Sequence, residues 1–324
     1  MTARVPVLAA VACIAVVAVS GCGDSAASDS GDGLSVAAST GAWASVARAI
    51  GGESVHVSAV IDDPVADPHS YESTAEDVLT FTRADLAVVN GGGYDSFAEG
   101  LADQAPDVPV IDAFALSGHE APEHEEAEHE EAEHEEAGHE HDHAHEHGGV
   151  NEHVWYDLHV VEQVADELVE RLSKLAPEQA AEFEANGKKF ADGLAKLRAE
   201  LAAVKKQAGG AEVVSTEPVA FYLLEAAGLR DVTPKAFSNA IEGDSDVPVA
   251  AQAEVRRRVE SGTVAAVVNN PQTETAVTRE LVSVAERAGT PVVEIGEMPP
   301  DGESDYLRWV EAEVAKLKAA VAKS

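Results

Sequence analysis

Residues 178–208, EQAAEFEANGKKFADGLAKLRAELAAVKKQA, predict one long helix. The stretch contains no proline, and its large apolar residues recur at helical spacing: Phe183, Phe190, Leu194, Leu197, Leu201 and Val204. Gly187 and Gly193 lie within the pattern and weaken the prediction slightly, because glycine lowers helix stability. At 1.5 Å per residue the helix would run roughly 45 Å, which is long enough to cross a domain boundary.

Short β-branched runs alternate with amphipathic stretches on both sides of this helix. Such alternation predicts parallel sheets with helices on their faces. Before the helix we expect strands at 34–39, 55–61, 86–90 and 108–112, and helices at 43–50 and 73–82. After it we expect strands at 212–215, 264–269 and 291–295, and helices at 221–227, 277–288 and 306–321. The helix at 73–82 would have Ser73 as its N-cap and Glu76 in the capping-box position.

These elements predict an α/β fold of two lobes, each with a mainly parallel sheet flanked by helices, joined by the one long rigid helix. A chain of 324 residues is long enough for two such lobes. We expect a signal peptide at 1–21, a lipidated tether at 22–33, an N-terminal lobe at 34–176, the linking helix at 177–208 and a C-terminal lobe at 209–324. The N-terminal lobe would carry an insert at 118–148.

The N-terminal segment has the pattern of a targeting signal. One basic residue, Arg4, precedes an apolar stretch that is too short and alanine-rich for a membrane span. The stretch ends in Val-Ser-Gly before Cys22, which resembles a bacterial lipobox and predicts lipidation at Cys22 and an extracytoplasmic, membrane-anchored protein. An ordinary secretory signal with a chance cysteine is the alternative. The other cysteine, Cys13, lies in the segment that would be removed, so neither a disulfide nor a thiolate metal site is expected.

The predicted insert is rich in histidine and glutamate. Residues 119–147 contain nine His, twelve Glu and one Asp, with no Lys or Arg. No apolar residue larger than Ala or Pro occurs there, so we expect a disordered insertion that packs no core. A plain solvated charge run is one interpretation, but the density of histidine favours weak binding of several cations. We hypothesise that the insert gathers metal and passes it to a tighter site.

The formal net charge of the chain is −37. Such a surface repels nucleic acid and favours cations. An apolar content of 45% nevertheless allows well-packed cores.

Outside the insert, four residues suit a metal site: His69, His153, Glu217 and Glu274. Three of them come shortly after a predicted strand, and ligands of open α/β sheets bind beyond the carboxyl ends of strands. Two come from each half of the chain and would meet in the cleft between the lobes, where a glycine-rich turn at 90–94 would also lie. Imidazole and carboxylate ligands suit Zn²⁺, Mn²⁺ and Fe²⁺.

Each of these residues also has a purely structural interpretation. His69 could cap a helix, Glu217 could begin one, and Glu274 could be a first-turn acid of the helix at 277–288. Asp67 and Asp157 could be partners of the imidazoles or ordinary surface acids. The remaining histidines outside the insert, His56 and His159, are expected to be structural or exposed.

Several motifs together resemble the zinc/manganese class of ABC-transporter solute-binding proteins. They are the lipobox, the sequence DDPVADPHSYE at 62–72, the His/Glu-rich insert, EHVWYD at 152–157 and the long helix. The resemblance covers about residues 34–320. It implies two lobes bridged by a rigid helix, with a metal in the cleft whose first ligand is His69 and whose second is His153.

The chain departs from that family's pattern at two points. Asn151 and Glu152 stand before His153, where Asp-Pro is usual. The third ligand is commonly His in zinc members and Glu in manganese members, and here it falls on Glu217. The fourth ligand would come from the loop at 270–274, where Glu274 is the chosen residue and Gln272 and Asn270 stay open as alternatives.

The resemblance implies a binding protein, not an enzyme, that captures a divalent transition metal and delivers it to an ABC permease in the cytoplasmic membrane. Zn²⁺ is the expected metal, because common sites bind it more tightly than Mn²⁺ and the insert is rich in imidazole. A manganese-specific protein of the same class is the first alternative. A zinc-dependent surface hydrolase is the second, although we expect no His-Glu-x-x-His helix, because the pattern falls at 139–143, within the insert that is expected to be disordered. An adhesin or a metal buffer is the third. Proteins of this class are expected to be monomers.

Overall fold

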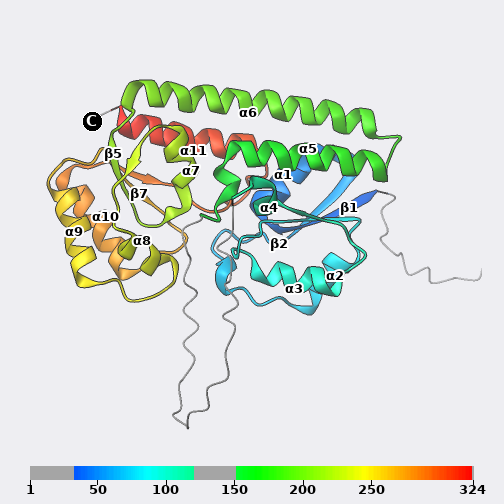
Figure 1. The fold of residues 1–324 in the computed structure, drawn as a ribbon, viewed down its shortest axis with the longest axis horizontal. Helices are drawn as coiled ribbons and strands as arrows, with labels where there is room; N and C mark the ends of the chain where they lie inside the picture. The colour runs from blue at the N-terminus through cyan, green and yellow to red at the C-terminus, as the bar shows by residue number, and fades with distance from the viewer. Residues whose placement is uncertain (1–32, 120–150, 323–324) are drawn as a thin grey trace, which may run out of the picture. The chain divides into compact units, whose positions relative to one another are not determined.

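The computed structural model describes residues 33–119 and 151–322 (Figure 1). These residues contain two four-stranded parallel sheets with the same topology. The first has the order β2-β1-β3-β4, with strands β1 (Leu34–Thr40), β2 (Val55–Ile61), β3 (Leu86–Val89) and β4 (Val110–Asp112). The second has the order β6-β5-β7-β8, with strands β5 (Glu212–Ser215), β6 (Arg230–Asp231), β7 (Ala266–Asn269) and β8 (Val292–Glu294). The predicted α/β class is confirmed.

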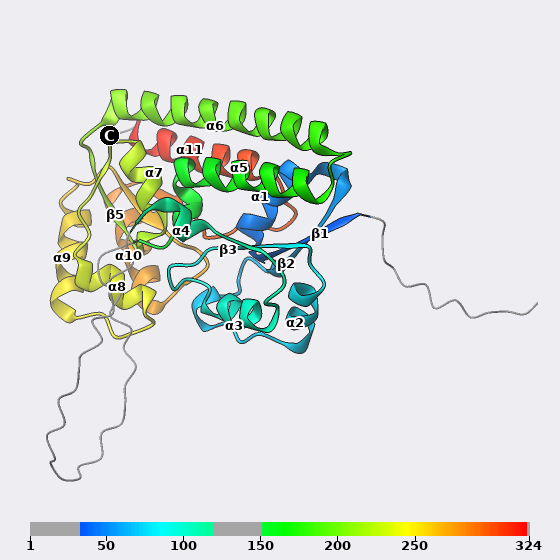
Figure 2. The ribbon, with the colours of Figure 1, turned by 45° about the vertical axis from the view of Figure 1, so that its right-hand side comes forward.

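Helices flank both sheets (Figures 1 and 2). The first half of the chain contributes α1 (Gly41–Gly51), α2 (Ala75–Thr82), α3 (Ser96–Gln104), α4 (Ala113–Ser117) and α5 (Leu158–Leu175). The second half contributes α7 (Phe221–Ala226), α8 (Lys235–Glu242), α9 (Val249–Glu260), α10 (Ala276–Ala288) and α11 (Tyr306–Val321). Four single 3-10 turns complete the described chain: η1 (Gly52–Ser54), η2 (Pro68–Ser70), η3 (Val154–Tyr156) and η4 (Pro218–Ala220).

The long helix is present as α6 (Ala180–Ala208), and its buried face consists of the six apolar residues that the sequence pattern selects. It lies alongside α5 and α11 (Figures 1 and 2). Its two glycines have a packing role. A Cβ at Gly187 would lie 2.6 Å from Val169 of α5, and one at Gly193 would collide with Leu307 of α11. The glycines that weaken the helix prediction thus allow close helix packing.

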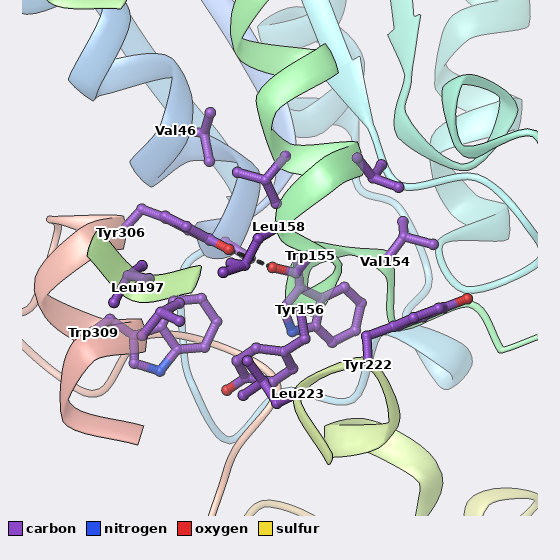
Figure 3. Packing of buried hydrophobic residues seen from close by; sticks show 14 of the residues in the cluster. Val46, Val154, Trp155, Tyr156, Leu158, Leu197, Tyr222, Leu223, Tyr306 and Trp309 are labelled. Carbon is purple, nitrogen blue, oxygen red and sulfur yellow. Dashed lines mark hydrogen bonds between the residues drawn. The ribbon is translucent and has the colours of Figure 1, made fainter. Parts of the chain in front are cut away.

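One hydrophobic core continues through both halves of the chain. It includes Val36 of β1 and Val213 of β5, together with the buried face of α6. Figure 3 shows the aromatic part of this core, where Tyr306 of α11 donates a 2.6 Å hydrogen bond to the carbonyl oxygen of Trp155. The rings of Tyr156 and Trp309 lie 5.4 Å apart. The aromatic contacts attach η3, which follows His153 directly, to the C-terminal helix.

The start of α2 differs from the sequence prediction. Thr74, not Ser73, is the N-cap, and Asp77, not Glu76, completes the capping box. Asp77 Oδ2 accepts hydrogen bonds from the backbone and hydroxyl of Thr74 at 2.7 and 2.8 Å. Both registers offer a hydroxyl three residues before an acid, so the sequence pattern alone does not distinguish them.

Within the described residues, no helix is long and apolar enough to cross a membrane. The predicted signal peptide, the lipidation at Cys22 and the tether lie outside the described residues, except for Gly33. The insert at 118–148 also lies outside them, apart from Gly118 and His119. Those assignments stay predictions.

Candidate metal centre

The candidate site lies beyond the carboxyl ends of the inner strands of both sheets. In each sheet the strand order reverses between the two inner strands, β1 and β3 in one and β5 and β7 in the other. Ligands of open parallel sheets bind at such reversals. The segments that leave β3, β5 and β7 supply Tyr94, Glu217 and Asn270 respectively.

His69 is held by the Asp-Pro-His turn in which it lies. Pro68 begins η2, and Asp67 caps it by accepting hydrogen bonds from the His69 backbone and the Ser70 hydroxyl, both at 2.9 Å. These bonds fix the backbone from which the His69 imidazole extends. Its ring packs edge-on against Tyr94, with ring centroids 5.0 Å apart.

His153 is 1% exposed and is oriented by Asn151. The Asn151 Oδ1 atom accepts the backbone N–H of His153 at 2.9 Å, and the His153 Nδ1 atom lies 3.0 Å from the same oxygen. An amide oxygen carries no hydrogen and can only accept, so His153 Nδ1 is the donor of this second bond. Nε2 is then the ring nitrogen that can bind a metal. Asn151 Nδ2 also donates to the Pro218 carbonyl oxygen at 2.8 Å, which ties this histidine to the second half of the chain.

Tyr94 lies at the end of a glycine loop that the carboxylate of Asp95 closes. Asp95 accepts hydrogen bonds from the backbone N–H groups of Asn90 and Gly91 at 2.7 and 2.8 Å. Gly91, Gly92 and Gly93 have φ angles of 74°, 66° and 91°, a left-handed conformation that favours glycine. The loop places the buried Tyr94 ring against both candidate imidazoles, 5.0 Å from His69 and 5.8 Å from His153 between centroids.

Glu217 follows β5 and is 5% exposed. Its Oε2 atom accepts hydrogen bonds from Asn270 Nδ2, at 2.7 Å, and from the Thr273 hydroxyl. Pro218 occupies the first position of η4, so the turn begins directly after the carboxylate. His69 and His153 therefore both border Tyr94, while Glu217 is bound to Asn270.

Glu274 is not brought to this place. Its side chain is 51% exposed, and its Oε1 atom lies 3.6 Å from Arg279 Nη1 on the surface. Thr275, the N-cap of α10, follows it directly, and the chain there turns the acid toward solvent. The two alternatives in the same loop have other contacts. Asn270 binds Glu217, and Gln272 hydrogen-bonds the backbone of Pro64 and of Glu297.

Glu297 is a residue that the sequence reasoning missed. It follows β8, is 6% exposed, and accepts hydrogen bonds from the Tyr94 hydroxyl and from Asn270 Nδ2, both at 2.8 Å. Asn270 Nδ2 therefore donates to Glu297 and Glu217 together, so these two carboxylates face each other across one amide. One feature of the sequence could have indicated Glu297. It is an acid that follows a strand and lies between the apolar residues Ile295 and Met298.

Two further buried acids border His153. Glu152 is 4% exposed, and its carbonyl oxygen accepts a 2.9 Å hydrogen bond from Asn90 Nδ2. Glu242 ends α8, and its Oε1 atom lies 3.8 Å from His153 Nε2. One ligand atom from each of Glu152, His153 and Glu242 lies within 4.8 Å of the others. The sequence analysis assigned a role to neither acid.

The carboxylates hold their protons strongly because they are buried together. Burial raises the pKa of Glu217, Glu297 and Glu152 to about 7 each. Burial, reinforced by the charges of Glu152, Glu217 and Glu297, raises the pKa of Glu242 to about 9. Like charges in a low-dielectric site oppose ionisation, and a divalent cation reverses this effect. The chemistry of the donors, imidazole and carboxylate, fits such a cation.

The remaining histidines and acids of the sequence analysis have structural or surface positions. His56 and His159 are exposed. Asp157 caps α5 by accepting the His159 backbone N–H at 2.9 Å, and Asp67 caps η2. The hydrogen-bond partner that orients His153 is Asn151.

Comparison with known proteins gives a consistent relationship. A model of the ZnuA family, described as zinc-uptake complex component A, periplasmic, matches residues 36–320. The manganese-binding lipoprotein MntA of Halalkalibacterium halodurans is 27% identical over 197 residues, which are 57% of this chain and 54% of that protein. The chain thus matches about half the length of this curated relative.

Solved structures share the fold. A crystal structure of ZnuA superposes with a TM-score of 0.67 at 17% identity and covers 90% of this chain and 100% of that one. The solute-binding protein FpvC of Pseudomonas aeruginosa, in complex with Mn²⁺, gives a TM-score of 0.67 at 20% identity, covering 90% and 99%.

Proposed function

The chain belongs to the ZnuA family of periplasmic zinc-uptake components, and from this premise we propose that it captures a divalent transition metal outside the cytoplasm and delivers it to an ABC-type importer. The observation that carries the proposal is the convergence of two imidazoles and two carboxylates, from both halves of the chain, around Tyr94 and Asn270. Such a donor set binds a transition metal ion.

The ligands that we propose are His69, His153, Glu217 and Glu297. Glu297 replaces Glu274 in this set because its carboxylate is buried and shares a hydrogen-bond donor with Glu217. A hydrogen bond from His153 to Asn151, and hydrogen bonds from Tyr94 and Asn270 to the carboxylates, fix the orientation of three of the four side chains. Groups of this kind around metal ligands set geometry and affinity.

Zn²⁺ is the metal that we propose, with Mn²⁺ as the alternative. The family description names zinc, whereas MntA is named for manganese and FpvC was solved with Mn²⁺. Two imidazoles and two carboxylates accept either ion, but the general affinity order places Zn²⁺ above Mn²⁺. Selectivity for Mn²⁺ would require a geometry that excludes Zn²⁺.

The proposal has four further parts. The protein binds metal without catalysis, carries a lipid anchor on Cys22, delivers the metal to an ABC permease and is a monomer. The matched relative is named as a lipoprotein, and the matched family is described as periplasmic. A zinc-dependent hydrolase would need a coordination position open to substrate, and four protein ligands would fill a tetrahedral Zn²⁺.

Competitive titration with a chromophoric chelator, combined with metal analysis, tests the proposal. We expect one tight Zn²⁺ per chain that is lost in His69→Ala and Glu217→Ala and kept in His56→Ala, whose imidazole is exposed on β2. A tight site that prefers Mn²⁺ would overturn the choice of metal. A tight site indifferent to His69 and Glu217 would overturn the site itself.

A further inference from the structure

Glu242 carries a buried carboxylate oxygen that lacks a hydrogen-bond partner. Its side chain is 8% exposed at the end of α8, and no donor reaches its Oε1 atom. This atom points at His153 Nε2, 3.8 Å away. Buried polar atoms are nearly always satisfied, because leaving one unpaired is costly. Glu242 Oε1 and His153 Nε2 are therefore two neighbouring buried atoms that are both able to bind a cation.

The spacing of the neighbouring donors suits a metal ion. Zn²⁺ binds imidazole nitrogen and carboxylate oxygen at about 2.0–2.2 Å, so two such ligands of one ion lie no more than ~4.3 Å apart. The 3.8 Å between His153 Nε2 and Glu242 Oε1 is within that limit. A carboxylate oxygen of the buried Glu152 lies within 4.8 Å of both atoms, close enough to join the same ion after a small side-chain shift.

We propose that Glu152, His153 and Glu242 form a second metal position, which alternates with the position bounded by His69, Glu217 and Glu297. The two positions exclude each other because they share one nitrogen. His153 Nδ1 donates its proton to Asn151, so Nε2 alone can bind a metal, and it binds one ion at a time. The chain therefore still holds one tightly bound ion at this centre.

The second position gives an incoming or departing ion a place to stay bound. An ion that leaves His69 keeps its bond to His153 and gains Glu242, so it does not pass through a state without protein ligands. One imidazole and two carboxylates are a normal donor set for a divalent transition metal. This inference rests on the proposed function, since it concerns the same cargo at the same centre.

The test is to remove the first position and ask where the ion goes. Crystals of the Zn²⁺-loaded full chain and of His69→Ala would be measured by anomalous scattering at the zinc edge, with affinities from chelator competition. In His69→Ala we expect weaker binding, with the anomalous peak at coordination distance from His153 Nε2 and Glu242 Oε1. Adding Glu242→Gln or Glu152→Gln should weaken the remaining site by about tenfold or more.

The matched control is His69→Ala combined with Glu286→Gln, which changes an exposed glutamate of α10 and should leave the remaining site unchanged. Thermal unfolding of the metal-free variants verifies that each is folded. The second position is overturned if His69→Ala binds no ion, if its ion lies by Glu217 and Glu297 away from Glu242, or if Glu242→Gln has no effect. Failure of the proposed function looks different: the unmodified chain would bind no tight ion, or His69→Ala would bind like it.

Discussion

The hydroxyl of Tyr94 donates a 2.8 Å hydrogen bond to Glu297 Oε2, across 203 residues of sequence. Tyr94 follows the third strand of the first sheet and Glu297 follows the last strand of the second. The same tyrosine ring contacts the imidazoles of His69 and His153. A single buried side chain thus sets the relative positions of two imidazoles from one half of the chain and a carboxylate from the other.

Tyr94→Phe should weaken metal binding while preserving the fold. The ring contacts remain, but Glu297 loses a donor that orients it, so we expect affinity to fall about 10–100-fold. Loss of the hydrogen bond should lower the free energy of unfolding by about 1 kcal/mol. Chelator competition and urea denaturation measure the two effects. Tyr71→Phe is the matched control, because the Tyr71 hydroxyl donates to Asp77 Oδ2 at 3.0 Å, and Asp77 is not a proposed ligand. Equal losses of affinity in both variants would contradict the role of Tyr94.

Glu297→Gln and Glu274→Gln distinguish the two candidates for the fourth ligand. Glu297→Gln removes a charge that we assign to the metal, so affinity should fall by about 100-fold or more, beyond the effect of an indirect partner. Glu274→Gln removes a surface pair with Arg279, which contributes about 0–1 kcal/mol to stability and nothing to metal binding. Titration of both variants in parallel decides the matter. A larger loss in Glu274→Gln would reverse the assignment.

The metal-free protein should lose stability as the pH rises from about 5 to 8. Burial raises the pKa of Glu217 and Glu297 from 4.5 to about 7, so the folded chain binds these protons more tightly than the unfolded chain. Their contribution is complete below the unfolded pKa and is lost as the pH rises through about 7. Glu242, with a pKa of about 9, extends the loss upward.

Thermal unfolding midpoints measured with a chelator present should therefore fall across this pH interval. With Zn²⁺ present the trend should reverse, because the ion displaces the same protons and binds more tightly as they leave. Glu297→Gln should flatten the slope of the metal-free protein. A midpoint that rises with pH in the metal-free chain, equally in Glu297→Gln, would contradict this view of the site.

Deletion of residues 118–148 should leave one tight metal site and remove the weak ones. All four proposed ligands lie outside this segment, whereas nine histidines of residues 119–147 lie within it. Isothermal titration with Zn²⁺ would show the weak phase disappear while the tight phase keeps its affinity. Loss of the tight phase would mean that the insert supplies a ligand.

Local patterns in the sequence were sufficient to predict most of the elements. The helix α6 has a clear apolar period over its whole length, and all six residues of that pattern are buried. In α9, by contrast, only Ala251, Val255 and Val259 are buried, and consecutive arginines obscure the narrow stripe. No element was predicted at α9, and the predicted ranges likewise omit α3, α4, α5, α8 and the two-residue strand β6. A segment with such a narrow apolar stripe forms a helix because it packs against the rest of the protein, and a local sequence pattern does not show that packing.

The site was only partly predictable for the same reason. His69 lies in a motif whose local capping bonds can be inferred from Asp67 and Pro68. Glu274 and Glu297 both follow strands of one sheet, and nothing near either residue says which one turns inward. That choice depends on Tyr94, which comes from a distant segment, and on Asn270, whose amide reaches Glu297 across 27 residues. The buried Glu242 depends in the same way on the packing of α8 near His153.

The continuous core has a consequence for the timescale of metal exchange. Residues of both sheets and the buried face of α6 belong to this one core, so separating the sheets would expose apolar surface to water, and we expect exchange to proceed by loop motions, which are faster than hinge opening. The segments at 62–74 and 295–305, which carry His69 and Glu297, are the candidates. Amide hydrogen exchange that responds to metal in these segments and leaves α6 unchanged would agree; a response throughout α6 would show instead that the core itself opens. Metal release would then be a local event in a chain whose interior remains closed.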